Sequence, residues 1–280
     1  MIGCWSFLVV MEIKIGFVSR DDRESIKLVE ELVKHFRSKA KILFDPELAH
    51  KIGDSGTPVD DMDVDFIVSV GGDGTLLRTI QKMRDPRPIL GINMGTLGFL
   101  VDVEPVDAVS TLEHILHGFE VEERPRLKIS LNGSDLPPAT NEVALITASP
   151  AKMLEFEIVV DDSLLERLRA DGLLFATSTG STAYAMSAGG PIVDPRVDAI
   201  VLVPMAPFKL SARPWVLPGG SVIKVELVLP GKDALVVIDG QSMASISKDD
   251  LITISRAETP ARFIKTRENG FYEKVKSKLA

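Results

Sequence analysis

Two periods of hydrophobic spacing alternate along the first hundred residues. Apolar runs at 13–18, 41–44, 64–70 and 89–92 are short enough to be strands, and the run at 64–70 is almost uninterrupted, as in a strand covered on both faces. Between the first two runs, apolar residues recur at the spacing of one helix face. They are Ile26, Val29, Leu32, Val33 and Phe36. This alternation predicts an α/β N-terminal domain with a parallel, Rossmann-like sheet.

Beyond a helix predicted from Pro105 to Gly118, the hydrophobic period changes to two. Short alternating runs are separated by turn pairs such as Asn132-Gly133 and Asp161-Asp162. Many short strands of this kind predict a β-rich, β-sandwich-like C-terminal domain. We therefore place the α/β domain at residues 1–104 and the β-rich domain at 105–261. The helical tail within 262–280 is expected to return to the first domain.

Composition narrows the class of protein. The 280 residues include 32 Lys+Arg and 40 Asp+Glu, so the net charge is −8. This balance argues against charge-driven binding to nucleic acid or to an anionic membrane, and no apolar run approaches the roughly 20 residues of a membrane span. The apolar start at 1–11 lacks the basic residues of a signal peptide, and Met11 is an alternative first residue. Cys4 is the only cysteine, which suits a reducing cytoplasm.

The sharpest motif is Gly71-Gly72-Asp73-Gly74-Thr75, which lies between the buried run at 64–70 and a predicted helix. Glycines let a phosphate approach the backbone, and a helix start offers free N–H groups. The loop is neither a Walker A motif nor a dinucleotide fingerprint. Phosphates repel a carboxylate, so Asp73 indicates a Mg²⁺ ligand, a general base or a ribose partner. The plainer alternative is an aspartate that caps the following helix.

A second loop, Thr177-Ser178-Thr179-Gly180-Ser181-Thr182, is rich in hydroxyl groups and precedes a short helical run that ends at Gly189-Gly190. Hydroxyl and N–H groups at a helix start suit ribose or phosphate. A nucleophile elbow is the competing interpretation, but its Gly-x-Ser-x-Gly pattern is absent. A capped turn would explain one or two of the hydroxyl groups only.

Together the two loops resemble the NAD kinase family. The resemblance also includes Gly91-Ile92-Asn93-Met94-Gly95-Thr96-Leu97-Gly98-Phe99-Leu100, the pair Asn141-Glu142 and Arg169-Ala170-Asp171-Gly172. These segments occur in a fixed order from about Gly71 to Gln241. The glycine loop alone is shared with diacylglycerol and sphingosine kinases, so the ordered set is much more specific than any one motif.

The resemblance implies transfer of a phosphoryl group to the 2′-hydroxyl of the adenosine ribose of NAD, which gives NADP. Asp73 would be the catalytic base. Gly71, Gly72 and Thr75 would hold the phosphate donor, ATP or polyphosphate, with Mg²⁺ offsetting its charge. The β-rich domain would bind NAD, and the family suggests a homodimer or homotetramer. The implied NAD-binding residues are Gly74, Arg78, Phe99, Asn141, Glu142, Arg169, Asp171, Thr182, Ala183, Tyr184, Ser187, Ala206 and Gln241.

Several alternatives stay open at this point. Asp171-Gly172 and Asp239-Gly240 are both ordinary turn pairs, and Arg78 could be a solvated helix residue. Asp239-Gly240-Gln241 also matches a family segment that could reach the site from another subunit. Phe208 stands where the family often has a histidine, so a role of that histidine is not expected here, whereas Ala206 is still expected at the adenine pocket. A lipid kinase and a non-catalytic nucleotide sensor are the competing functions. The sequence assigns no metal ligands and does not choose between NAD⁺ and NADH.

Overall fold

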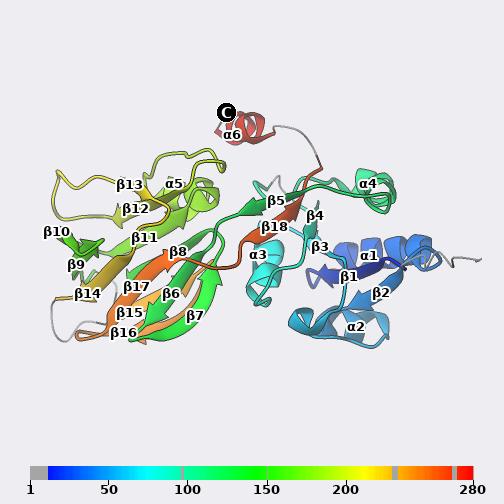
Figure 1. Cartoon of the computed structure of the whole chain (residues 1–280), viewed down its shortest axis with the longest axis horizontal. Coiled ribbons are helices and arrows are strands. Elements are labelled where there is room, and N and C mark those ends of the chain that lie inside the picture. Colours follow the sequence, from blue (N-terminus) through cyan, green and yellow to red (C-terminus); the bar gives the residue numbers. More distant parts are fainter. Residues whose placement is uncertain (1–11, 96–97, 150, 229–232, 267–269, 280) are drawn as a thin grey trace, which may run out of the picture. The chain divides into compact units, whose positions relative to one another are not determined.

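The computed structural model describes residues 12–95, 98–149, 151–228, 233–266 and 270–279 (Figure 1). The chain forms two compact units, one of Met1–Thr75 with Arg87–Glu120 and the other of Leu76–Pro86 with Val121–Ala280. The division thus falls at 120/121, whereas the hydrophobic pattern suggested 104/105. This division places the tail at 262–280 in the second unit, and its expected return to the first domain stays a prediction.

The first unit contains a parallel sheet, as predicted. Its strands run in the order β2-β1-β3-β4. The strands are β1 (Lys14–Ser19), β2 (Lys41–Phe44), β3 (Phe66–Gly71) and β4 (Ile89–Asn93). The helical segments are α1 (Arg23–Phe36), α2 (Pro46–Ile52), η1 (Val59–Asp61), η2 (Pro105–Asp107), α4 (Ala108–Ile115) and the start of α3 (Asp73–Gln81). In a parallel sheet all carboxyl ends lie at one edge, so the residues that follow β1, β3 and β4 share that edge.

Helix α1 shows why the local sequence pattern was sufficient to predict a helix at this point of the chain. Asp22 caps it, and its carboxylate accepts hydrogen bonds from the N–H groups of Glu24 and Ser25. The buried apolar stripe of the helix consists of Val29, Leu32, Val33 and Phe36. The stripe covers the parallel strands, and the cap satisfies the first orphan donors of the helix.

The second unit is dominated by two antiparallel sheets, as the period of two indicated. Their strand orders are β10-β9-β14-β17-β6-β7 and β13-β12-β11-β8-β15-β16. The first sheet contains β6 (Leu127–Leu131), β7 (Ser134–Ala139), β9 (Leu154–Val160), β10 (Ser163–Ala170), β14 (Ile223–Leu227) and β17 (Leu251–Arg256). The second contains β8 (Glu142–Thr147), β11 (Gly172–Thr177), β12 (Ala199–Met205), β13 (Trp215–Pro218), β15 (Ala234–Ile238) and β16 (Gln241–Ile246).

The remaining elements of this unit are short. Strand β5 (Val121–Arg124) pairs with β18 (Ala261–Ile264) in the antiparallel direction. The helical segments are η3 (Thr179–Thr182), α5 (Tyr184–Ser187) and α6 (Phe271–Leu279). Tyr272 of α6 donates a hydrogen bond to Asp194 at 2.7 Å, which ties the helix to the second unit. None of the helices in the described part of the chain is long and apolar enough to cross a membrane.

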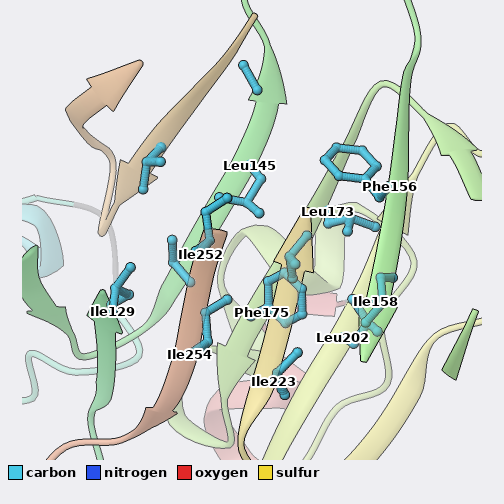
Figure 2. Close-up of a cluster of buried hydrophobic side chains, with 14 of the residues drawn as sticks. Ile129, Leu145, Phe156, Ile158, Leu173, Phe175, Leu202, Ile223, Ile252 and Ile254 are labelled. Atoms are coloured by element: carbon cyan, nitrogen blue, oxygen red, sulfur yellow. The ribbon is translucent and has the colours of Figure 1, made fainter. Parts of the chain in front are cut away.

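The core of the second unit lies between its two sheets. Figure 2 shows side chains of both sheets meeting there, with Phe156 and Ile254 from one sheet and Leu173, Phe175 and Leu202 from the other. All five are almost completely buried. Each strand presents alternate residues to this layer, because successive side chains of a strand point to opposite faces. The sandwich is the rigid support for the loops at its ends.

Candidate active site

The glycine loop connects β3 to α3 at the carboxyl edge of the parallel sheet. Thr75 N–H donates to the carbonyl of Gly72 (2.9 Å), and Met94 N–H donates to the carbonyl of Gly71 (3.0 Å). Added Cβ atoms at Gly72 and Gly74 would meet no atom within 4 Å. The backbone of the loop is therefore held by hydrogen bonds on one side and is open on the other. Such a loop can admit a phosphate at the start of a helix.

The carboxylate of Asp73 binds a distant backbone segment. Its Oδ2 accepts from Phe99 N–H (2.7 Å), and its Oδ1 accepts from Leu100 and Val101 N–H (both 3.1 Å). The carboxylate thus joins the start of α3 to the segment after β4, in place of the helix cap that was the plainer alternative. These bonds hold its oxygen atoms in one orientation.

Gly98 makes this arrangement possible. A Cβ atom at this position would overlap the Asp73 carboxylate. The segment therefore approaches Asp73 so closely that only glycine fits. Two residues of the same family-like segment, Thr96 and Leu97, lie outside the described residues.

Sequence reasoning missed Arg20, which follows β1 at the same edge. Its N–H donates to the Val70 carbonyl (2.8 Å), and its guanidinium donates to the Met94 carbonyl (3.2 Å) and to Asp22 (2.6 Å). These bonds place a cation beside the glycine loop. The position immediately after the first parallel strand was the available signal, because that position shares an edge with the end of β3.

In the second unit, Asn141 and Glu142 lie at the start of β8. Both residues are buried, with 7% and 8% exposure, and Asn141 Oδ1 and Glu142 Oε2 have no hydrogen-bond partner among the described residues. Thr177 N–H donates to the Asn141 carbonyl (2.9 Å), and a Cβ atom at Gly180 would overlap that carbonyl. Buried polar atoms normally have partners. Two unpaired oxygen atoms on a firmly held backbone are therefore characteristic of a ligand site.

Most hydroxyl groups of the second loop bind the protein itself. The hydroxyl groups of Thr177, Ser178, Ser181 and Thr182 all donate to backbone carbonyls. The Thr182 bond, to the Thr179 carbonyl, is long at 3.4 Å. Thr179 Oγ1 is buried without a partner among the described residues. Thr179, which was not among the expected contacts, is thus the hydroxyl of this loop left for a ligand.

Two acids, buried Glu142 and half-buried Asp239, lie beside Asn141. Burial, and then the charge of Asp239, raise the pKa of Glu142 to about 8. Burial also raises the pKa of Asp239, although three backbone N–H groups and Arg126 oppose that rise. Asp239 has the better-compensated carboxylate, because three N–H groups and Arg126 favour its charged form and Glu142 has no such partners.

Three of the expected NAD contacts, Arg169, Asp171 and Ala206, lie near the other end of β11. Asp171 N–H donates to the Met205 carbonyl (3.0 Å), which brings Asp171 beside Ala206. The Arg169 guanidinium lies 5.4 Å from the centre of the Phe208 ring. Along β11, Gly172 is paired with Ile146 and Ala176 with Glu142, so the two groups are about 13 Å apart along the strand. Phe208 thus has a partner of its own, in Arg169, where the family often has histidine.

The other expected contacts differ in exposure. Gly74, Arg78, Tyr184 and Ser187 are exposed, whereas Phe99, Ala183 and Gln241 are half-buried. Tyr184 and Ser187 begin and end α5, which follows the hydroxyl loop directly. Among the described residues, no group of three or more His, Cys, Asp or Glu side chains could hold a metal ion.

The parallel sheet with its glycine loop, joined to a β-sandwich with buried unpaired acceptors, defines a two-domain nucleotide-binding phosphotransferase. Two family models match: the ATP-NAD kinase N-terminal domain at residues 15–119 and the ATP-NAD kinase C-terminal domain at 140–266. The chain belongs to the ATP-NAD kinase family. This result favours the NAD kinase interpretation over the lipid kinase alternative.

Curated relatives agree over almost the whole chain. The chain is 54% identical to the NAD kinase of Methanosarcina acetivorans over 95% of its length and 98% of the relative. It is 41% identical to the NAD kinase of Thermococcus kodakarensis over 90% of its length and 94% of the relative.

Two solved structures share the fold. An NAD kinase from Archaeoglobus fulgidus, in complex with ATP, is 36% identical with a TM-score of 0.78 over 95% of this chain and 99% of that one. Yeast NADH kinase complexed with NADH is 24% identical with a TM-score of 0.89 over 96% and 87%. These matches confirm the predicted combination of an α/β unit with a β-rich unit.

Proposed function

We propose that this chain phosphorylates the 2′-hydroxyl of the adenosine ribose of NAD to give NADP, with Asp73 as the general base. NAD kinase activity follows from family membership, which relatives at 40–54% identity over 95% of the chain support. The observation that carries the proposed mechanism is the oriented carboxylate of Asp73 within the open glycine loop.

The hydrogen bonds of Asp73 leave room for a substrate hydroxyl. Each carboxylate oxygen has two lone pairs, and Oδ2 accepts only the N–H of Phe99 in the described structure. Its second lone pair can accept the ribose hydroxyl proton while the segment at 99–101 holds the group in place. Phosphoryl transfer depends mainly on positioning and electrostatics, so a fixed acceptor suits it.

The donor side of the proposal uses Gly71, Gly72 and Thr75, with Arg20 beside them. Backbone N–H groups at the start of α3 and the Arg20 cation would attract phosphate oxygens. We propose ATP as the donor, because the structurally similar Archaeoglobus fulgidus enzyme was solved in complex with ATP. Mg²⁺ would be bound chiefly by the donor phosphates and by water, as is usual for this ion in phosphoryl transfer.

The proposed NAD contacts fall into two groups at opposite ends of β11. Asn141 and Glu142 form one group, and Asp171 and Ala206 belong to the other. A homodimer or homotetramer, in which a second copy supplies one of the groups, would bring them to one ligand. This separation supports the proposed oligomer. We also propose a cytoplasmic location, where NAD and ATP are available.

The direct test is Asp73→Asn in the full-length protein. The amide cannot accept a proton as a carboxylate does, so we expect kcat to fall by roughly 10²- to 10⁴-fold with a smaller change in the KM for NAD. NADP formation should be measured with NAD⁺ and NADH against ATP and polyphosphate, and folding should be checked by thermal unfolding. Asp63→Asn is the matched control, because Asp63 is an exposed partner of Lys14. Near-native turnover of Asp73→Asn would refute the base, and no NADP from the native chain with any donor would refute the function.

A further inference from the structure

The carboxylate of Asp239 binds the backbone at the start of β8 through three hydrogen bonds. Its Oδ2 accepts from Thr140 N–H (2.8 Å), and its Oδ1 accepts from Asn141 N–H (2.8 Å) and Glu142 N–H (3.1 Å). Its own N–H donates to the Glu142 carbonyl (3.0 Å). The Asp239 side chain therefore fixes the backbone of three consecutive residues, two of which carry the unpaired acceptors described above.

The hairpin turn alone does not require a carboxylate here. Asp239 has φ +46° and Gly240 has φ +78°, the geometry of a turn in which asparagine serves as well as aspartate. An asparagine, however, would place its NH₂ group against one of the N–H groups that Asp239 accepts. The half-buried charge is also costly, even with buried Arg126 nearby to offset it. A carboxylate is therefore needed to accept all three N–H groups of residues 140–142.

The same charge determines what Glu142 can offer a ligand. Asp239 is the charged group that faces Glu142, and Arg126 is the cation that faces Asp239. A second negative charge beside Asp239 is unfavourable, so Glu142 keeps its proton at neutral pH and is a hydrogen-bond donor. Buried Glu142 Oε2, without a partner among the described residues, is available to a ribose hydroxyl or an amide oxygen.

We propose that Asp239 is a positioning residue for NAD, which holds the backbone of Asn141 and Glu142 so that their unpaired side-chain oxygen atoms face the dinucleotide. The inference rests on the proposed function, in which Asn141 and Glu142 contact NAD. Asp239 itself acts through these two residues, since its oxygen atoms are occupied by the backbone.

The test is Asp239→Asn in the full-length protein, with kcat and the KM for NAD measured from pH 6 to pH 9. We expect the KM to rise by roughly tenfold to hundredfold at pH 7, because a small displacement of a substrate contact has such effects, while kcat changes less. The rise in KM with pH should also begin at a lower pH than in the native enzyme, because the Asp239 charge no longer raises the pKa of Glu142. A further Glu142→Gln change should remove this pH dependence but not the defect at pH 7.

Asp161→Asn is the matched control. Asp161 also has a positive φ, +47°, in a hairpin turn, and its carboxylate accepts from Val222 N–H (2.8 Å) and Ser221 Oγ (2.9 Å). It lies on the β9–β10 turn of the other sheet. We expect it to lower the melting temperature without changing the KM for NAD or its pH profile.

Asp239→Glu serves as a second variant should Asp239→Asn fold poorly. It keeps the negative charge but moves the carboxylate away from the three N–H groups. The KM for NAD should therefore rise, while the midpoint of its pH dependence stays near that of the native enzyme. Native KM values at every pH in a folded Asp239 variant would overturn the inference. If Asn141→Ala and Glu142→Ala also bind NAD normally in calorimetry, these two residues do not contact NAD. The proposed contacts and the inference about Asp239 would then both be wrong. If those variants lose binding and Asp239→Asn does not, only the inference fails.

Discussion

Two carboxyl groups in this chain show how environment assigns roles to similar residues. Asp73 accepts three backbone N–H groups, whereas Glu142 Oε2 is buried with no partner among the described residues. The three N–H groups hold the Asp73 oxygen atoms in one orientation, whereas burial without partners favours the neutral form of Glu142. We therefore expect Asp73 to present a fixed acceptor to the substrate and Glu142 to donate a hydrogen bond.

The raised pKa of Glu142 predicts a pH dependence of stability. Its folded pKa of about 8 lies above the ordinary value of 4.5, so between these values the folded state binds a proton that the unfolded state has lost. The stabilisation is complete below about pH 4.5 and is lost as the pH rises through 8, with a slope of up to about 1.4 kcal/mol per pH unit. Urea unfolding at several pH values, for the native chain and for Glu142→Gln, measures this effect.

Glu142→Gln is neutral at every pH and should lack this slope. From pH 5 to pH 8, the unfolding free energy of the native chain should therefore fall relative to that of Glu142→Gln. Above pH 8, the difference between the two should become constant. Groups with lowered pKa values, such as Asp22 and Glu113, are common to both proteins and cancel. Parallel curves over this range would show that Glu142 is ionised in the folded state.

At two places in this protein, a glycine without a side chain lets one element approach another closely. The start of α3 is linked to the segment after β4 through Asp73, and Gly98 provides the space. The hydroxyl loop is linked to the start of β8 through Gly180, which packs on the Asn141 backbone. In each case one glycine determines how near a candidate site residue lies to a second element.

Gly98→Ala tests the first of these contacts. The new Cβ atom would overlap the Asp73 carboxylate, so the segment at 99–101 must move and the three hydrogen bonds weaken. We expect kcat/KM for NAD to fall by roughly 10²-fold, with a stability loss of about 1–3 kcal/mol. Steady-state kinetics and urea unfolding give both quantities.

Gly220→Ala is the control for this prediction. A Cβ atom at Gly220 would meet nothing within 4 Å, and the residue lies between β13 and β14 in the other unit from Asp73. It should leave kinetics and stability almost unchanged. Native kinetics in Gly98→Ala as well would mean that the Asp73 contacts do not matter for turnover.

At the scale of the whole molecule, the two units are not two consecutive pieces of chain. The second unit includes Leu76–Pro86, which lies inside the sequence of the first. Fully buried Arg126 donates to the Thr259 carbonyl (2.9 Å) and the Arg84 carbonyl (3.3 Å), and Arg262 binds Asp85 (2.7 Å). The segment at 76–86 therefore supplies one hydrogen-bond acceptor to the buried Arg126 and an ion-pair partner to Arg262.

This organisation predicts that a fragment of residues 121–280 is less stable than its sandwich core suggests. Without Arg84, the buried Arg126 loses an acceptor, and leaving a buried charged donor unsatisfied costs about 1–3 kcal/mol or more. Urea unfolding of the fragment and of the same fragment joined to residues 76–86 by a flexible linker would measure the difference. Equal unfolding midpoints would show that the segment adds nothing to this unit.

The acidic charge of the whole chain also gains a local explanation. The net charge of −8 argues against binding of polyanions over the surface, yet the proposed substrates are polyanions. The Arg20 guanidinium, which is paired with Asp22, and the N–H groups at the start of α3 lie beside the glycine loop. In the second unit, the raised pKa of Glu142 favours its neutral form.

The sequence by itself determined the features that depend on neighbours along the chain. The apolar stripe of α1 and its cap at Asp22, the turn at Asn132-Gly133 and the glycine loop after β3 are all local, because hydrophobic period, capping and turn chemistry act over a few residues. The ordered motifs also indicated the family, which the comparisons confirmed.

Only the tertiary structure decided the partners of the candidate site residues. Asp73 binds N–H groups 26 to 28 residues away, and Asp239 binds N–H groups 97 to 99 residues away. Backbone N–H groups look alike in any sequence, so no pattern indicates which of them a carboxylate will meet. Packing between distant segments, which hydrophobic spacing does not encode, determines the unpaired oxygens of Thr179 and Glu142, the raised pKa of Asp239 and the division of the chain at 120/121.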